Sequence, residues 1–274
     1  MERIYDITGK VLVNNQISGK HWLLKLYCPE IAISIKPGQF VSIRLTRQTD
    51  PLFRRPFTIY RVHSEEGSIS IIYQVVGKGT ELLSAMTAEE TLDVLGPLGN
   101  GFQLPENGEA IALVGRNTGI APLVALAEEA LLQEHKVYAF FSAADSGLFK
   151  ITKSLNNRKC ELLLYPDNGI WGCGIHLTKK MAQVLGQERI SSLYTGGLCS
   201  FCASCGVEKF VHQYARANSI TAQISREQYM SCAVGACLGC VIPTFTGPEQ
   251  EQVDYRKVCK DGPVFLSWEV VKNG

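Results

Sequence analysis

Cys232-Ala-Val-Gly-Ala-Cys237-Leu-Gly-Cys240 is the stretch around which this chain is organised, and Cys259 follows it further on. Four residues separate the first two cysteines and two separate the next pair, which is the plant-type ligand pattern of a [2Fe–2S] cluster. Gly235 and Gly239 lie between the ligands, where backbone without a Cβ can pass close to the inorganic sulfides. Two disulfides or a zinc site are the alternatives, although the glycines and the unequal spacing fit zinc poorly.

Length, charge and cysteine content set the limits of the interpretation. The chain has 274 residues and a net charge of +1, so two sizeable domains fit and no electrostatic argument favours nucleic acid or an anionic membrane. We find no apolar run long enough for a transmembrane helix and no signal peptide at the start. Ten cysteines without such a signal favour a reducing compartment in which thiolates bind metal, so we expect a cytoplasmic protein.

The first part of the chain, from about Val11 to Val94, has the pattern of short β-strands. Its runs are apolar or alternating and are separated by Gly- and Pro-containing turns; they cover residues 22–27, 40–45, 57–62 and 69–75. This regular spacing is typical of a small antiparallel barrel. A Gly- and Pro-rich stretch at 95–102 ends it, and we predict a first domain over residues 1–101.

Two motifs in the barrel could bind a pyrophosphate. Arg54-Arg55-Pro56-Phe57-Thr58 places two guanidinium groups where they could grip phosphate oxygens, and Thr58 could bond an isoalloxazine edge. A solvated barrel edge explains the arginines about equally well. In Gly77-Lys78-Gly79-Thr80, glycines precede a helix that Thr80 could cap. The start of this helix could hold the same anion, or the helix could simply be an ordinary capped one.

From Glu109 onward the pattern changes to alternating strands and helices. Strands are predicted at 110–114, 137–142, 160–165 and 192–195, with a helix at 121–133. The alternation indicates a parallel sheet whose ligand lies at the carboxyl ends of the strands. The turn Gly115-Arg-Asn-Thr-Gly119 is the place for a dinucleotide phosphate, although only two of its residues are glycine. We predict this α/β domain over residues 102–221 and a small cluster module over 222–274.

Six cysteines lie outside the four-cysteine set discussed above and within the two larger domains. Cys199, Cys202 and Cys205 follow a predicted strand and could bind a second iron–sulfur cluster, with Cys173 as a fourth ligand. Alternatively, they are small buried thiols in a tight turn. Cys28 lies in an apolar, strand-like run, as does Cys160, and we predict both as core residues.

Taken together, the motifs resemble the electron-transfer subunit of the NAD-dependent dihydroorotate dehydrogenase, within the ferredoxin–NADP reductase superfamily. The resemblance covers nearly the whole chain and is most specific at Arg256-Lys-Val-Cys259-Lys-Asp-Gly-Pro-Val-Phe265. It implies an FAD-binding barrel, an NAD(P)-binding-like α/β domain and a C-terminal [2Fe–2S] module with Cys232, Cys237, Cys240 and Cys259 as ligands. The predicted cofactor-binding residues are Arg54, Arg55, Pro56, Phe57, Thr58, Ile72, Tyr73, Gln74, Gly79 and Thr80 for FAD, and Gly115 and Gly119 for the nucleotide.

This chain departs from the family pattern at four places. Gln74 stands where family members usually have Arg, near the flavin phosphates. Family members usually have three glycines where this chain has Gly115-Arg116-Asn117. They usually have paired aspartates and Ser near Asp167-Asn168-Gly169. They usually have a Cys-Gly-Pro turn where this chain has Gly196-Gly197-Leu198-Cys199. These three all lie on the nicotinamide side.

The resemblance implies a redox relay in pyrimidine biosynthesis. Electrons pass from NAD(H) through FAD and the cluster to an FMN-containing barrel subunit that oxidises dihydroorotate, in a heterotetramer. No side chain is required as a catalytic acid or base, because the cofactors carry the chemistry. One alternative is the FAD/[2Fe–2S] subunit of another anaerobic complex, such as a ferredoxin–NAD(P) oxidoreductase or a sulfite-reducing assembly. The other is a non-enzymatic docking scaffold.

Overall fold

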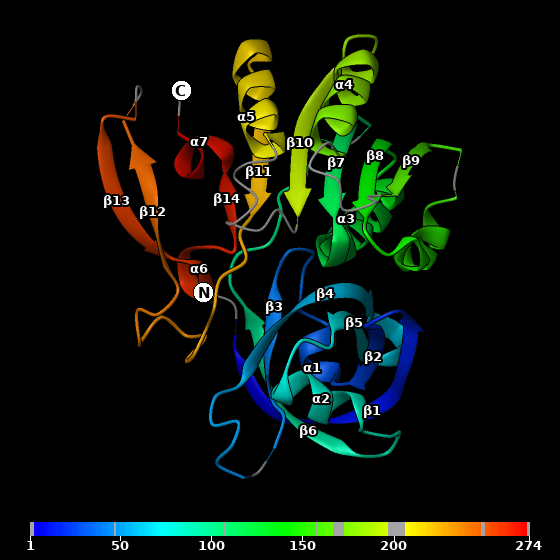
Figure 1. The fold of residues 1–274 in the computed structure, drawn as a ribbon, viewed down its shortest axis with the longest axis vertical. Helices are drawn as coiled ribbons and strands as arrows, with labels where there is room; N and C mark the ends of the chain where they lie inside the picture. The colour runs from blue at the N-terminus through cyan, green and yellow to red at the C-terminus, as the bar shows by residue number, and fades with distance from the viewer. Residues whose placement is uncertain are drawn as a thin grey trace.

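The computed structural model describes residues 3–46, 48–106, 108–156, 158–166, 173–196, 206–247 and 250–272. Figure 1 shows three regions: a barrel formed by the first third of the chain, a sheet with flanking helices beside it, and a two-stranded ribbon at the outer edge of the molecule. Within the described ranges, no helix is both long and apolar enough to cross a membrane.

The barrel closes in the strand order β1-β2-β5-β4-β3-β6. Its strands are β1 (Tyr5–Ser18), β2 (His21–Tyr27), β3 (Phe40–Arg44), β4 (Arg55–His63), β5 (Ser68–Gln74) and β6 (Thr91–Leu98), with α1 (Pro29–Ala32), η1 (Ser64–Glu66) and α2 (Lys78–Ser84) between them. Every second side chain fills the interior, as Leu24 and Leu26 on β2 and Ile69 and Ile71 on β5 show, all with 0% exposure. The predicted antiparallel barrel is therefore confirmed.

The second sheet has the order β14-β11-β10-β7-β8-β9, in which all the strands except β14 run parallel. These strands are β7 (Ala110–Arg116), β8 (Lys136–Ala143), β9 (Cys160–Pro166), β10 (Ile190–Gly196), β11 (Thr221–Ser225) and β14 (Val264–Leu266). Alternate residues of β7 pack on opposite faces: Leu113 against α3 (Ile120–Leu132), and Val114 against α4 (Cys173–Leu185) and α5 (Val207–Asn218). The predicted parallel sheet is confirmed, with helices covering both faces.

The last part of the chain is built into the sheet as well as appended to it. The ribbon strands β12 (Val241–Thr246) and β13 (Gln252–Lys257) pair only with each other and are followed by α6 (Val258–Asp261). The chain then returns as β14, pairs antiparallel with β11, and ends in α7 (Ser267–Val270). The predicted small module therefore contributes the edge strand of the second sheet.

The barrel and the sheet share one hydrophobic core. Tyr60 and Ile72 from the barrel pack in the same buried cluster as α3 and Phe141 of β8. Polar bonds cross this junction too: Tyr60 donates to the carbonyl of Ile151 at 2.8 Å, and Arg61 forms an ion pair with Glu128 of α3. This contact holds the two regions in a defined relative position, which matters for any ligand that lies between them.

Two of the cysteines outside the four-cysteine set have described surroundings. Cys28 is fully buried in the barrel core, as predicted, and burial raises its pKa to about 12. Cys160 is only partly buried and packs against the edge of the shared core.

Candidate functional site

One cavity of about 560 Å³ collects residues from all three regions of the chain. The barrel supplies nine residues predicted for FAD: Arg55, Pro56, Phe57, Thr58, Ile72, Tyr73, Gln74, Gly79 and Thr80. Thr118 comes from the short turn η2 (Asn117–Gly119), and Pro122 comes from the start of α3. Residues 226–230 and Pro263 come from the C-terminal part. The structure therefore brings the separate barrel motifs together, as the sequence predicted, and adds a third wall.

The two adjacent arginines differ in where their side chains lie. Arg55 lines the cavity, where its Nη1 donates to the carbonyl of Phe53 at 2.8 Å and, among the described residues, it makes no ion pair. Arg54 does not line the cavity. Its guanidinium pairs with Asp6 at 3.0 Å and donates to the carbonyl of Asp93 at 2.8 Å, so it joins β1 to β6. The structure therefore places Arg55, but not Arg54, in the wall of the cavity.

The glycine–threonine motif lies directly beside Arg55. A Cβ at Gly79 would lie 3.0 Å from Leu45 Cδ1 and 3.5 Å from Arg55 Nε, so a larger residue there would push the guanidinium away. Thr80 is the third helical residue rather than the cap, and its hydroxyl accepts from the backbone of Val76 and Gly77 at 3.0 and 3.3 Å. A free cation beside an open helix start fits a pyrophosphate.

The strand β5 presents Ile72 and Gln74 to one side and Tyr73 to the other. Tyr73 packs with Phe57 and Trp22 at the barrel end, and its hydroxyl donates to Asn14 Oδ1 at 2.9 Å. Burial raises the pKa of this phenol, so it stays neutral. The Tyr73 hydroxyl is thus engaged in a hydrogen bond within the barrel, which fixes the side chain in place. The aromatic and aliphatic side chains here give the cavity a rigid wall suited to a planar ring.

The segment 226–230 is the part of the site that the sequence did not predict. Arg226 pairs with Glu208 of α5 at 2.7 Å and donates to the carbonyl of Val270 at 2.9 Å, which fixes the segment from behind. Glu227 lines the cavity, and its side chain is exposed to solvent there. Tyr229 is 85% exposed at the cavity. The sequence does offer one indication of this role, since the segment directly precedes Cys232. A cluster that exchanges electrons with a flavin must lie near that flavin.

The four predicted cluster cysteines form two pairs. The backbone N–H of Cys237 donates to Cys232 Sγ at 3.3 Å, and that of Cys259 donates to Cys240 Sγ at 3.4 Å. All four are free thiols. Among the described residues, no group of three or more His, Cys, Asp or Glu side chains is arranged to hold a single metal ion. Two pairs of thiols suit two irons that each take two thiolates.

The thiols of the predicted cluster ligands differ in pKa. Burial opposes ionisation of Cys232, but backbone N–H groups of Val234, Ala236 and Cys237 outweigh it and lower the pKa of the thiol to about 6. Burial raises the pKa of Cys259 to about 12, and the Cys240 thiol beside it adds to the effect. A Cβ at Gly235, whose φ is +84°, would meet Lys260 Cδ at 3.1 Å. The donor set and the glycine cradle fit an iron–sulfur cluster.

At the nucleotide side, the two predicted glycines lie at the carboxyl end of the sheet. Gly115 of β7 pairs with Gly196 of β10, where the strand order reverses and ligands of such sheets bind. A Cβ at Gly196 would lie 2.5 Å from the carbonyl of Gly119, so the turn approaches this strand closely. Asn117 adopts a φ of 49° and its Oδ1 accepts from the backbone of Ala144, which ties the turn to the end of β8.

Some predictions fall on residues that the structure does not describe. Cys199, Cys202 and Cys205 lie outside the described residues, as do residues 167–169 and 197–199, and the side chain of Cys173 is likewise not described. The second iron–sulfur cluster therefore stays a prediction.

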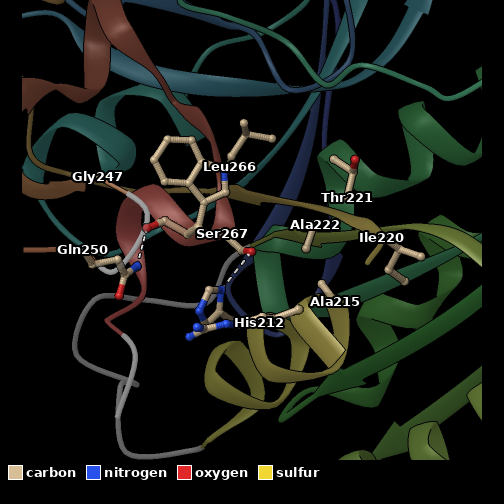
Figure 2. Close-up of a pocket in the computed structure, with 11 residues that line it drawn as sticks. His212, Ala215, Ile220, Thr221, Ala222, Gly247, Gln250, Leu266 and Ser267 are labelled. Atoms are coloured by element: carbon tan, nitrogen blue, oxygen red, sulfur yellow. Dashed lines mark hydrogen bonds between the residues drawn. The ribbon is translucent and has the colours of Figure 1, made fainter. Parts of the chain in front are cut away.

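A second cavity, of about 530 Å³, lies between α5, β11 and α7 (Figure 2). His212 Nδ1 lies 3.1 Å from Ser267 Oγ there, and Gln250 bonds the carbonyl of Trp268. None of the residues predicted for a cofactor lines this cavity, so the flavin and cluster residues define the candidate site.

Comparison with known proteins gives the family. Residues 227–271 match the model of the iron–sulfur cluster binding domain of dihydroorotate dehydrogenase B, and residues 8–102 match that of the oxidoreductase FAD-binding domain. The chain is 30% identical, over 99% of both proteins, to the dihydroorotate dehydrogenase B (NAD(+)) electron transfer subunit of Desulforamulus reducens. The chain belongs to this family of electron transfer subunits. The corresponding subunit of Shouchella clausii is 35% identical to it over 86% of each chain.

Solved structures place the electron transfer subunit fold among ferredoxin reductases. The NADH-dependent reduced ferredoxin–NADP oxidoreductase matches with a TM-score of 0.77 and 25% identity, covering 96% of this chain and 89% of that chain. The ferredoxin–NADP+ reductase of Plasmodium falciparum matches with a TM-score of 0.60 and 10% identity, covering 82% of this chain and 96% of that one, so its likeness concerns the fold alone.

Proposed function

We propose that this chain relays electrons between a nicotinamide nucleotide and the catalytic subunit of a dihydroorotate dehydrogenase B complex, in the cytoplasm. The observation that carries the proposal is the single cavity in which predicted flavin residues of the barrel meet the segment 226–230, which continues into Cys232. Family membership over the whole length supports the same activity. We also propose the division into residues 1–101, 102–221 and 222–274 as flavin, nucleotide and cluster regions.

The residues have separate tasks in this relay. When bound, FAD supplies hydride exchange and single-electron release, and the [2Fe–2S] cluster supplies one-electron transfer. Arg55 binds the diphosphate with Gly79 and Thr80, while Pro56, Phe57, Thr58, Ile72, Tyr73 and Gln74 hold the rest of the flavin. Cys232, Cys237, Cys240 and Cys259 ligate the irons. Gly115 and Gly119 let the nucleotide phosphates approach the sheet.

The test is anaerobic purification of the chain together with its dihydroorotate dehydrogenase catalytic subunit. We expect about one FAD and two irons per chain, bleaching of the flavin by NADH, and NAD-linked oxidation of dihydroorotate by the complex. A second Fe–S cluster at Cys199, Cys202 and Cys205 would raise the iron content, and Cys202→Ser would then lower it. A colourless protein, or one that forms no complex with this subunit, would contradict the proposal.

A second candidate function follows from the structural match of 25% identity and TM-score 0.77. In it, the chain is the FAD/[2Fe–2S] subunit of a ferredoxin–NADP oxidoreductase. The two functions predict different acceptors. Reduction of NADP by reduced ferredoxin, in a complex that leaves dihydroorotate unchanged, would favour the second candidate.

A further inference from the structure

The flavin cavity has charged side chains of both signs in its wall. They are Arg55, Lys78 and Arg226, which are cationic, and Asp50 and Glu227, which are acidic. The guanidinium of Arg226 is held by an ion pair with Glu208 and by the carbonyl of Val270, so its charge is already balanced within the fold. Among the described residues of the wall, Arg55 and Lys78 are therefore the cations that an anion in the cavity could attract.

Lys78 lies close to Arg55 in this wall, although it is not among the predicted flavin residues. It directly precedes Gly79, and a Cβ on Gly79 would lie 3.5 Å from Arg55 Nε. On its other side, a Cβ on Gly77 would meet no atom within 4 Å, so the turn before Lys78 faces open space. A ligand that reaches Arg55 therefore comes within reach of the flexible lysine side chain as well.

The ammonium group of Lys78 forms an ion pair with Asp50, which lines the same cavity. The side chains of the pair are 60% exposed for Lys78 and 74% exposed for Asp50. Ion pairs that are this exposed to water are screened by salt and contribute little to stability. Exchanging Asp50 for another anion therefore costs the protein little.

The diphosphate of FAD requires more positive charge than Arg55 supplies. Each of its two phosphate groups carries a negative charge at neutral pH, whereas Arg55 is a single cation. Gln74 and Thr80, which line the same wall, can donate hydrogen bonds but carry no charge. Lys78 would bring the positive charge of the wall to the value that balances a diphosphate.

We propose that Lys78 is a further binding residue for the FAD diphosphate and that Asp50 competes with the diphosphate for it. The inference rests on the proposed function, in which FAD binds in this cavity. In the FAD-free protein the ammonium group pairs with Asp50, and on binding it pairs with a phosphate oxygen while the carboxylate turns to solvent. The exchange is favourable because a charge-assisted bond inside the cavity is stronger than an exposed ion pair.

A purely structural role for the same ion pair makes a different prediction. Asp50 follows β3 in the chain and Lys78 begins α2, so the pair also connects these two parts of the barrel. If that connection were its only role, removing either partner would weaken FAD binding in the same direction. Competition instead predicts opposite effects, because removal of Asp50 frees the lysine for the phosphate.

The test titrates FAD back into full-length, cluster-loaded protein from which FAD has been removed, and follows flavin fluorescence. Lys78→Gln should weaken FAD binding about 10-fold, and Asp50→Asn should strengthen it about threefold at low salt. Lys78→Arg, which keeps the charge, should stay within about threefold of wild type. Lys10→Gln is the matched control, because it breaks an exposed barrel ion pair with Glu89 that lies outside the cavity.

Two further measurements identify the diphosphate as the group that Lys78 binds. ADP, which carries a diphosphate but no flavin ring, should compete with FAD about 10-fold less well in Lys78→Gln than in wild type. Riboflavin, which has no phosphate, should bind both proteins equally. Raising the salt concentration should weaken FAD binding more in wild type than in Lys78→Gln, since one charge contact is missing in the variant.

The outcomes separate the inference from the proposed function. Equal weakening of FAD binding by Lys78→Gln and Asp50→Asn would show that the ion pair only shapes the barrel, and the inference would be wrong while the function stands. The same holds if Lys78→Gln binds FAD as well as Lys10→Gln does. If wild type binds no FAD, the function and the inference both fail.

Discussion

Neighbouring residues of the same type have different tasks in this protein, and Arg54 and Arg55 are the clearest case. The guanidinium of Arg54 is held by Asp6 and by the carbonyl of Asp93, which leaves it no reach into the cavity. Arg55 lines the cavity beside Gly79 and makes no ion pair with a described residue. The first arginine stabilises the barrel, and the second is available for a phosphate.

Substituting each arginine separately tests this difference. Arg55→Ala should weaken FAD binding by about 10- to 100-fold, since a charge-assisted hydrogen bond contributes about 1.5–3 kcal/mol. Arg54→Ala is the matched control, and it should lower the unfolding temperature while FAD affinity stays near that of wild type. Fluorescence titration of the FAD-free protein measures the affinity. Equal losses of affinity in both variants would contradict the assignment.

At the scale of elements, the turn before η3 (Ser146–Leu155) holds the hairpin of β1 and β2. Asp145 accepts from Ser18 Oγ at 2.8 Å and from the backbone of Gly147 at 2.9 Å, and it lies 3.3 Å from His21 Nδ1. The Ser18 hydroxyl is the main cause of the lowered pKa of this carboxyl; burial opposes it, and Gly147 and His21 add to it. One carboxylate therefore ties the barrel to the α/β region.

Removing this carboxylate should destabilise the protein in a pH-dependent way. A lowered folded pKa stabilises the fold above the unfolded pKa, and that stability is lost as the pH falls through the folded pKa. Asp145→Ala should cost about 1–2 kcal/mol at neutral pH and nothing at strongly acidic pH, as measured by urea unfolding. Glu134→Ala, which removes an exposed ion pair with Lys159, should cost less than 1 kcal/mol.

The elements that the sequence predicts well are those whose pattern is local. Leu24 and Leu26, or Ile69 and Ile71, alternate with outward residues, so the barrel strands can be read directly from the chain. β14 has only three residues and pairs with β11 from about forty residues away, so no local period reveals it. A short strand that forms only because it pairs with a distant strand cannot be predicted from the periodicity of its own residues.

The candidate site shows the same division. Some glycines are needed because a neighbouring side chain lies close to them, as Arg55 does at Gly79 and Lys260 at Gly235. These glycines belong to motifs that stand out in the sequence. The fixing of residues 226–230 by Glu208 and the carbonyl of Val270 depends on how α5 and α7 pack, so the sequence did not predict this third wall of the cavity. The different direction of Arg54 likewise depends on Asp6 being near it in space.

At the scale of the whole molecule, the barrel and the parallel sheet are joined by one core. Tyr60 packs with residues of α3 and its hydroxyl reaches Ile151 across the junction. We expect the two regions to unfold in one transition, so that far-UV circular dichroism and flavin release give the same midpoint in urea. Tyr60→Ala should lower both midpoints together, by about 3 kcal/mol in stability. Two separate midpoints would mean that the junction does not couple the regions.

The edge position of β14 has a consequence for incomplete chains. β14 covers the outer hydrogen-bonding edge of β11, and it follows that strand in the chain. A chain that ends before residue 264 would leave that edge bare, and bare edges recruit strands from other molecules. Premature termination or C-terminal proteolysis should therefore give aggregates rather than a shorter working enzyme.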